Sequence, residues 1–177
     1  NGSRFAPKSI LAELLKLNNH LETKNINHRE VSSQQDECEN FEKAQLESSN
    51  QILEYLKQQE EFSKTIHIGG GHDHIFPLLK AIDTSNRFDN IFILNIDAHC
   101  DTRVDNQKHS GTPFRNFATI AKTPFHITQY GIHLATNSKS TLTPRETCSE
   151  KHFYMNELPR LTENYTLLPT RVYKDCP

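Results

Sequence analysis

A nearly continuous apolar run at residues 90–96 (NIFILNI) constrains the fold most, because such a run is typical of a parallel strand buried on both faces. A shorter apolar segment, Thr65–Ile68, ends in three glycines and is expected to form another strand. Between them, Ile75–Ile82 has the composition of a helix, with Pro77 in its first turn, where proline is tolerated. Strand, helix and strand within about 30 residues predict a βαβ unit.

The remaining patterns extend this unit into one α/β domain. Apolar residues recur at helical spacing over Pro7–Leu21, and Asp36–Phe62 carries apolar residues among many polar ones, as an exposed helix does. His126–His133 is expected to form a third strand and Thr166–Tyr173 a fourth. Since 177 residues is the length of one ordinary domain, residues 1–177 are predicted to form a single α/β domain with a mainly parallel sheet.

The composition argues against several kinds of partner. The formal net charge is -2 and the basic residues are scattered, so neither nucleic acid nor a membrane surface is an expected partner. No signal peptide is expected, and no apolar run of the sequence approaches the length that spans a bilayer. There is no CxxC motif, and the four cysteines lie far apart, at Cys38, Cys100, Cys148 and Cys176. Free thiols in a cytoplasmic setting are therefore expected.

Histidine and carboxylate side chains follow both strands of the predicted βαβ unit. His72 follows the first strand after a glycine turn, and the second strand is followed by Asp97, His99 and Asp101. Ligands of open parallel sheets bind outside the carboxyl ends of the strands. If the backbone stays extended after the second strand, these three side chains point to one side and Cys100 points away. The four residues are therefore candidate ligands of a divalent metal ion.

Each motif has a simpler interpretation when it stands alone. A single DxHxD loop is usually solvated charge or a cap, and a GGGH segment is usually only a turn. Their occurrence at two strand ends of one βαβ unit favours metal binding. Carboxylates favour Mg or Mn, imidazole extends the choice to Mn, Fe, Co, Ni or Zn, and the lack of thiolates argues against structural zinc. His74 is expected to be a surface histidine or to lie behind the ligands.

The two motifs resemble those of the ureohydrolase superfamily, which contains arginases, agmatinases and formimidoylglutamases. The GG-x-H turn of that superfamily matches residues 69–72, and its D-A-H-x-D strand end matches residues 97–101. The resemblance implies a three-layer α/β/α sandwich that holds two Mn ions, which activate water for attack on an amidine-type carbon. The implied substrate is a small amidine or guanidino compound, and the protein is expected to form a homo-oligomer.

The resemblance also assigns roles to the candidate ligands. It implies that His72 and Asp101 bind one Mn ion, that His99 binds the other, and that Asp97 bridges the two ions. Asp101 is thereby a candidate catalytic residue as well as a metal ligand.

Three details resemble the formimidoylglutamase branch. Gly71 gives the turn GGGHD, where arginases have an acidic residue at that position. Arg103 lies two residues after the last candidate ligand, where arginases carry an asparagine, and a guanidinium is a bidentate partner for a substrate carboxylate. Ser110–Arg115 (SGTPFR) resembles the S-G-T-P-F segment of that branch, which makes Ser110 a second candidate substrate-binding residue. The implied reaction converts N-formimidoyl-glutamate and water into glutamate and formamide.

Other interpretations of these residues remain open. Arginases and agmatinases usually have a histidine at the position of Ser110, and His109 lies one residue earlier, so a shifted alignment makes His109 a candidate proton shuttle. The simpler interpretation of Arg103 is a surface arginine. An arginase or agmatinase activity therefore remains an alternative.

The match ends before the second carboxylate pair of the superfamily. The sequence contains no S-x-D-x-D motif; the nearest candidate ligand is Asp175, with Pro177 at the place of the second aspartate. The chain thus resembles the N-terminal part of a ureohydrolase and is expected to be a truncated product or fragment. A non-catalytic binding or assembly subunit that keeps the fold remains an alternative to a hydrolase.

Overall fold

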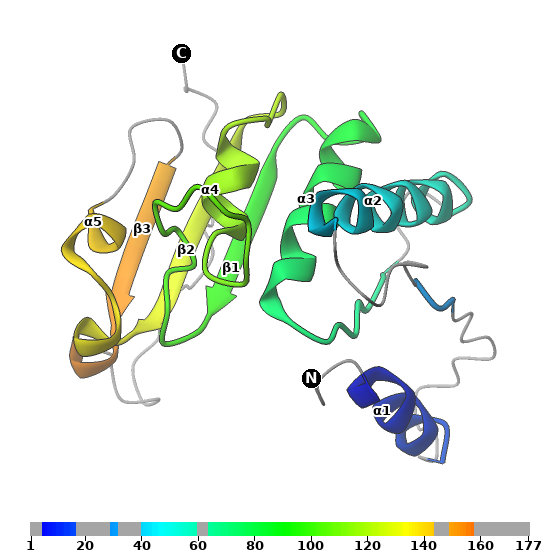
Figure 1. Cartoon of the computed structure of the whole chain (residues 1–177), viewed down its shortest axis with the longest axis horizontal. Helices are drawn as coiled ribbons and strands as arrows, with labels where there is room; N and C mark the ends of the chain where they lie inside the picture. The colour runs from blue at the N-terminus through cyan, green and yellow to red at the C-terminus, as the bar shows by residue number, and fades with distance from the viewer. Residues whose placement is uncertain (1–4, 17–28, 32–39, 60–63, 144–148, 158–177) are drawn as a thin grey trace.

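The computed structural model of the chain contains a parallel three-stranded sheet accompanied by helices (Figure 1). It describes residues 5–16, 29–31, 40–59, 64–143 and 149–157. The strands are β1 (Ile91–Ile96), β2 (Phe125–Ile132) and β3 (Ser149–Tyr154), in the order β1-β2-β3, and both neighbouring pairs are parallel. The predicted α/β class with a mainly parallel sheet is therefore confirmed.

Helices connect and flank these strands. The α-helices of the described residues are α1 (Ala6–Leu14), α2 (Phe41–Lys57), α3 (Ile75–Thr84), α4 (Pro113–Ala118) and α5 (Lys139–Leu142). Short 3-10 helices occur as η2 (His72–His74), η3 (Leu134–Thr136) and η4 (Met155–Glu157). Parallel neighbours need crossover connections, and α4 lies in the one between β1 and β2, whereas α5 lies in the one between β2 and β3.

Local sequence signals explain where two of the helices begin. The side chain of Asn40 accepts a hydrogen bond from the backbone N–H of Lys43 (3.1 Å) and so caps the first turn of α2. Pro77 lies in the first turn of α3, where a missing N–H costs little because the first N–H groups of a helix have no helical partner. The helix predicted over Pro7–Leu21 is seen as α1, and residues 17–28 lie outside the described part of the chain.

The core lies between α3, α4 and one face of the sheet. Its buried members are Phe76, Leu79, Ile91, Phe114, Phe117, Phe125 and Ile127. Phe117 is fully buried, and its ring centroid lies 4.9 Å from that of Phe125 in a tilted arrangement. Figure 1 shows α4 lying across β1 and β2, with α3 beside β1. The core therefore holds α3 against β1, so that the segment before α3 meets the segment after β1.

Two expectations about strands are wrong. Thr65–Ile68 forms no strand, because it pairs with no neighbouring backbone among the described residues, and Ile66 is 83% exposed. The crossover units are instead β1–α4–β2 and β2–α5–β3. In addition, β1 is not buried on both faces, since Phe92 and Ile96 are 44% and 71% exposed. The described part of the chain thus places its helical core on one face of the sheet.

The fourth strand expected over Thr166–Tyr173 lies outside the described residues. Within the described residues, every helix is too short or too polar to cross a membrane.

Candidate metal site

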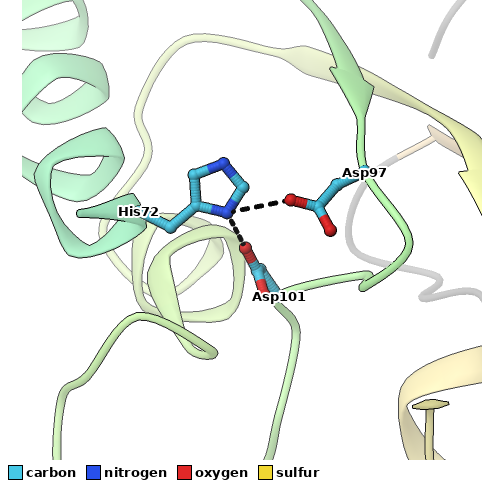
Figure 2. Close-up of side chains that lie close together, drawn as sticks. All are labelled: His72, Asp97 and Asp101. Carbon is cyan, nitrogen blue, oxygen red and sulfur yellow. Dashed lines mark hydrogen bonds and ion pairs between the residues drawn. The ribbon is translucent and has the colours of Figure 1, made fainter. Parts of the chain in front are cut away.

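His72 lies in a short turn that is held against α2. The turn, η2, follows the glycine run directly, and the backbone N–H of His74 donates to the carbonyl of Gly71 (3.1 Å). From α2, the side-chain amide of Gln45 donates to the carbonyl of Asp73 (3.2 Å). Because η2 leads directly into α3, which the core holds beside β1, the imidazole of His72 faces the segment that follows β1 (Figure 2).

The acidic segment after β1 bends instead of continuing as an extended strand. The backbone N–H of His99 donates to Oδ1 of Asp97 (2.8 Å), which turns the chain, and Asp101 has a φ of 52°. Aspartate tolerates this left-handed conformation better than most residues do. The expected alternation along an extended backbone is therefore wrong. Cys100 is nevertheless fully buried, whereas Asp97 and Asp101 lie beside His72.

His72, Asp97 and Asp101 converge although the loop bends. Nδ1 of His72 lies 2.5 Å from Oδ2 of Asp101 and 3.3 Å from Oδ2 of Asp97 (Figure 2). Each of the three residues offers one potential ligand atom, and these three atoms lie within 4.8 Å of one another. The other oxygen of Asp97, Oδ1, lies 3.2 Å from Nδ1 of His99. Asp97 thus lies between two histidines and presents one oxygen to each of them.

The burial of these side chains is uneven. The side chain of Asp101 is 9% exposed, compared with 24% for Asp97 and 40% for His72. Burial raises the pKa of Asp101 above the usual carboxyl range, and the neighbouring His72 partly offsets this rise. A divalent cation would supply the positive charge that a buried carboxylate requires. Because imidazole nitrogen and carboxylate oxygen are both donors that Mn accepts, these residues fit a manganese ion.

A cavity of about 180 Å³ opens beside this cluster. Its lining residues are His72, His99, Asp101, Arg103, Ser110 and Gly111. The candidate substrate-binding residues Arg103 and Ser110 therefore share a cavity with candidate metal ligands. A Cβ atom on residue 111 would lie 3.0 Å from Cδ of Arg103 and 3.1 Å from Cε1 of His109, so a glycine at this position allows both side chains to approach closely.

His109 is held by its own loop and is not among the residues that line the cavity. Its Nδ1 accepts a hydrogen bond from the backbone N–H of Gly111 (3.0 Å), and its Nε2 lies 3.2 Å from Oδ2 of Asp105. In the neutral ring, Nε2 therefore carries the proton. Since both ring nitrogens are engaged, a proton-shuttling role for His109 stays a prediction that this geometry does not favour.

His74 and Asp175 are two other residues that the sequence singles out. His74 is half-buried behind the turn, its ring 6.1 Å from that of His67, and its Nδ1 has no hydrogen-bond partner among the described residues. Asp175 lies outside the described residues, so its role as a ligand stays a prediction.

Sequence reasoning overlooked the amide side chains that surround the acidic loop, which are Asn95, Gln129 and Asn137. Asn95 and Gln129 are buried polar residues within apolar strands, and this pattern is the signal that would have revealed them. Buried amides need hydrogen-bond partners, and these amides find theirs in the backbone of residues 98–100.

The fold and the site define an α/β protein with a histidine–carboxylate cluster at the carboxyl end of a parallel strand. The sequence profile of the Arginase family matches residues 1–168. The chain therefore belongs to the arginase family, and the resemblance to ureohydrolases that its motifs indicate is confirmed.

Individual relatives match over part of the chain. The formimidoylglutamase of Hahella chejuensis is 33% identical over 115 residues, which cover 59% of this chain and 36% of that protein. The formimidoylglutamase of Salmonella arizonae is 31% identical over 80 residues, which cover 44% of this chain and 26% of that protein. The chain thus spans between 26% and 36% of the length of these relatives. No solved structure is significantly similar to the chain.

Proposed function

We propose that this chain carries a manganese-binding part of a hydrolase that cleaves linear C–N bonds in amidine or guanidino compounds. The observation that carries this proposal is the position of Asp97, whose two oxygens lie 3.3 Å from Nδ1 of His72 and 3.2 Å from Nδ1 of His99. A carboxylate between two imidazoles supports a bridging role, with His72 and Asp101 on one ion and His99 on the other. Membership of the arginase family supports the same assignment.

The chemistry divides between the metal and the residues of the chain. Bound Mn would supply Lewis-acid chemistry that activates water and polarises the carbon under attack. Asp101 lines the cavity, and its second oxygen, Oδ1, would orient the attacking water. In the hydrolysis of N-formimidoyl-glutamate, the water oxygen joins the formimidoyl carbon and the bond from that carbon to the glutamate nitrogen breaks. One water proton passes to that nitrogen and the other ends on the remaining formimidoyl nitrogen, so that the products are glutamate and formamide.

The position of Arg103 supports N-formimidoyl-glutamate as the substrate. Arg103 lines the cavity together with His99 and Asp101, and its guanidinium makes no hydrogen bond or ion pair with any described residue. An unengaged guanidinium beside the cluster is suited to bind the carboxylate of a glutamate-derived substrate. Ser110 lines the same cavity and offers a hydroxyl to the same carboxylate. Relatives named formimidoylglutamase, at 33% and 31% identity, add further support.

The architecture beyond the described residues is part of the same proposal. We expect residues 1–177 to belong to one arginase-like domain whose sheet is covered by helices on both faces. The exposed apolar side chains of Phe92 and Ile96 support this expectation, because a second helical layer would remove them from water. A homo-oligomeric state and a cytoplasmic location stay predictions.

Ligand binding and turnover by the Mn-loaded protein, completed with a segment that carries the second carboxylate pair, test the proposed function. N-formimidoyl-glutamate, arginine and agmatine are compared, and agmatine is the control ligand because it has no carboxylate. Arg103→Ala is expected to weaken binding of N-formimidoyl-glutamate roughly ten- to a hundredfold, as loss of a charge-assisted hydrogen bond does, and to leave agmatine binding unchanged. Arg87→Ala is the matched control variant, since it removes a guanidinium that binds the carbonyl of Leu56 before β1 begins.

The outcomes separate the competing functions. Turnover of N-formimidoyl-glutamate to glutamate supports the proposal. Preferred turnover of arginine or agmatine would replace it with an arginase or agmatinase activity. Binding of a ligand without turnover would favour a non-catalytic binding subunit, and an equal loss for all three ligands in Arg103→Ala would exclude the carboxylate-binding role.

A further inference from the structure

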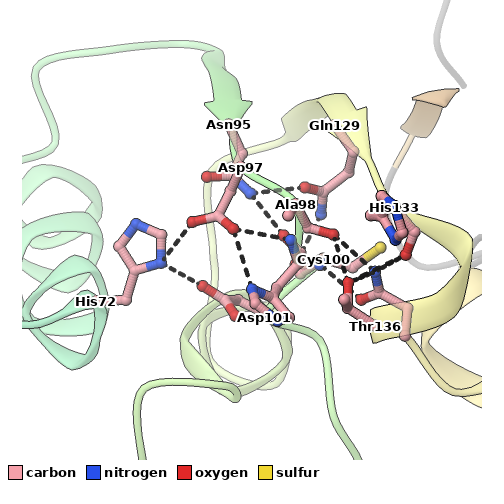
Figure 3. A network of polar contacts seen from close by, with 11 residues as sticks. His72, Asn95, Asp97, Ala98, Cys100, Asp101, Gln129, His133 and Thr136 are labelled. Carbon is pink, nitrogen blue, oxygen red and sulfur yellow. Dashed lines mark hydrogen bonds and ion pairs between the residues drawn. The ribbon is translucent and has the colours of Figure 1, made fainter. Parts of the chain in front are cut away.

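We infer that the side-chain amides of Asn95, Gln129 and Asn137 are positioning residues for the metal-binding loop, an inference that rests on the proposed metal site. We call these three residues the amide clamp. They come from β1, from β2 and from the segment that follows η3, and they bind consecutive peptide groups between Asp97 and Asp101. Figure 3 shows Asn95 and Gln129 beside this loop.

Asn95 and Gln129 form the buried half of the clamp. They are paired in register across β1 and β2 and are 8% and 0% exposed. Nδ2 of Asn95 donates to Oε1 of Gln129 (2.9 Å) and to the carbonyl of His99 (3.2 Å). Nε2 of Gln129 donates to the carbonyl of Cys100 (2.9 Å). Breaking these hydrogen bonds would leave buried amide groups without partners, at the full free-energy cost of their desolvation. The pair therefore fixes the carbonyls of His99 and Cys100 relative to the sheet.

Asn137 forms the second half of the clamp and binds the loop through both of its side-chain atoms. Its Oδ1 accepts a hydrogen bond from the backbone N–H of Cys100 (3.0 Å). Its Nδ2 donates to the carbonyl of Ala98 (2.8 Å) and to the carbonyl of His133 (2.9 Å). The carbonyl of Ala98 also accepts from the backbone N–H of His133 (3.0 Å). The loop is thereby tied to the segment that leaves β2.

The clamp acts on the site through the backbone alone. None of its three amides lines the cavity or belongs to the cluster of His72, Asp97 and Asp101. The loop between the two aspartates bends and ends in a residue at positive φ, a conformation that persists only when the surroundings hold it. By fixing the peptide groups, the clamp holds the side chains of Asp97, His99 and Asp101 in place in the metal-free protein. The free energy of metal binding is then not spent on ordering them.

Two variants remove one half of the clamp each. Gln129→Met has a similar volume and removes the hydrogen bonds of the Gln129 amide to Asn95, to the carbonyl of Cys100 and to Oε1 of Glu150. Asn137→Ala acts at a half-buried position, so it decides the question even if Gln129→Met does not fold. Each is expected to raise the Kd for Mn by roughly ten- to a hundredfold, as measured from the signal of free Mn in electron paramagnetic resonance titrations of the purified chain.

Further variants separate positioning from general stability. Asn137→Asp keeps the acceptor for the Cys100 amide, so the hydrogen exchange of that amide is expected to stay slow in the metal-free protein, whereas it accelerates in Asn137→Ala. Asp83→Asn is the matched control, because this carboxylate is 5% exposed and accepts hydrogen bonds from the backbone N–H groups of Lys122 and Thr123, before β2. It is expected to lower the melting temperature and leave the Kd for Mn unchanged.

The possible failures are distinguishable. Wild-type Mn affinity in both Gln129→Met and Asn137→Ala would overturn the positioning role and leave the metal site intact. An unchanged exchange rate of the Cys100 amide in Asn137→Ala would overturn the clamp without reference to metal. Absence of Mn binding by the wild-type chain would overturn the proposed metal site and the inference with it.

Discussion

Replacement of Asp101 by asparagine separates the two roles that the structure gives this carboxylate. Asparagine has the same shape and also tolerates the positive φ of 52° at this position, so the substitution changes the charge and little else. Burial raises the pKa of Asp101, and a raised carboxyl pKa means that ionisation at neutral pH is less favourable in the folded state than in the unfolded state. Metal-free Asp101→Asn is therefore expected to be at least as stable as the metal-free wild type.

The effect of Mn is expected to be the opposite. A ligand present at 100 times its Kd stabilises the folded state by about 2.7 kcal/mol. For a chain of 177 residues, that stabilisation corresponds to a rise of about 5 to 11 °C in melting temperature. The wild type is expected to show this rise in thermal melts with saturating Mn. Asp101→Asn is expected to lose most of it, because the substitution removes an anionic ligand.

The matched control is Asp89→Asn, which removes an exposed carboxylate shortly before β1, at the end of the strand opposite to the site. It should keep the full Mn-dependent rise in melting temperature. A large loss of stability in metal-free Asp101→Asn would refute the burial argument. A rise with Mn that is equal in wild type and Asp101→Asn would refute the assignment of Asp101 as a ligand.

The remaining predictions concern the loop and the core. The hydrogen bond from the Gln107 backbone, followed by that from His109, lowers the pKa of Asp105, so its carboxyl should titrate below the usual range in ¹³C NMR, and the midpoint should rise in His109→Ala. Because this folded-state pKa is depressed, its small stabilising effect is present above the unfolded pKa and is lost as the pH falls through the folded value. Phe117→Ala removes a fully buried ring packed on Phe125 and should cost about 3–5 kcal/mol in urea denaturation; a cost below about 1 kcal/mol would show that the core is not packed as described.

The parts of the site that follow from local patterns could be predicted from the sequence. The apolar run of β1 and the acids directly after it place Asp97 at a strand end, and a helix that starts beside His72 follows from the composition of α3. The sequence also predicted that His72 meets the acids, but the strand over Thr65–Ile68 from which this was argued is absent from the described residues, and it is the packing of α3 against β1 that brings His72 to the end of β1. The position of Asp97 and the start of α3 depend on residues that are close in sequence, whereas His72 and Asp101 are 29 residues apart.

Other features depend on tertiary contacts and were not predictable in the same way. Thr65–Ile68 reads as a strand, but a strand needs a neighbour to pair with, and no described segment pairs with it. β3 has the polar sequence SEKHFY, which does not suggest a strand. It nevertheless pairs with β2, and the side chains of Glu150 and His152 are only 1% and 4% exposed. The bend after Asp97 combines the local bond from the His99 N–H to Asp97 with bonds from Gln129 and Asn137, which are distant in sequence, so simple alternation fails there.

Anomalous diffraction at the manganese edge, from crystals of the wild-type chain grown with MnCl₂, tests the metal site most directly. One peak is expected in contact with Nδ1 of His72 and with oxygens of Asp97 and Asp101, and a second peak, from the second ion, is expected between Asp97 and His99. The same crystals grown from Asp97→Asn protein should lose the density. A manganese peak that lies away from these four residues, or no peak in wild-type crystals at saturating Mn, would contradict the proposed metal site.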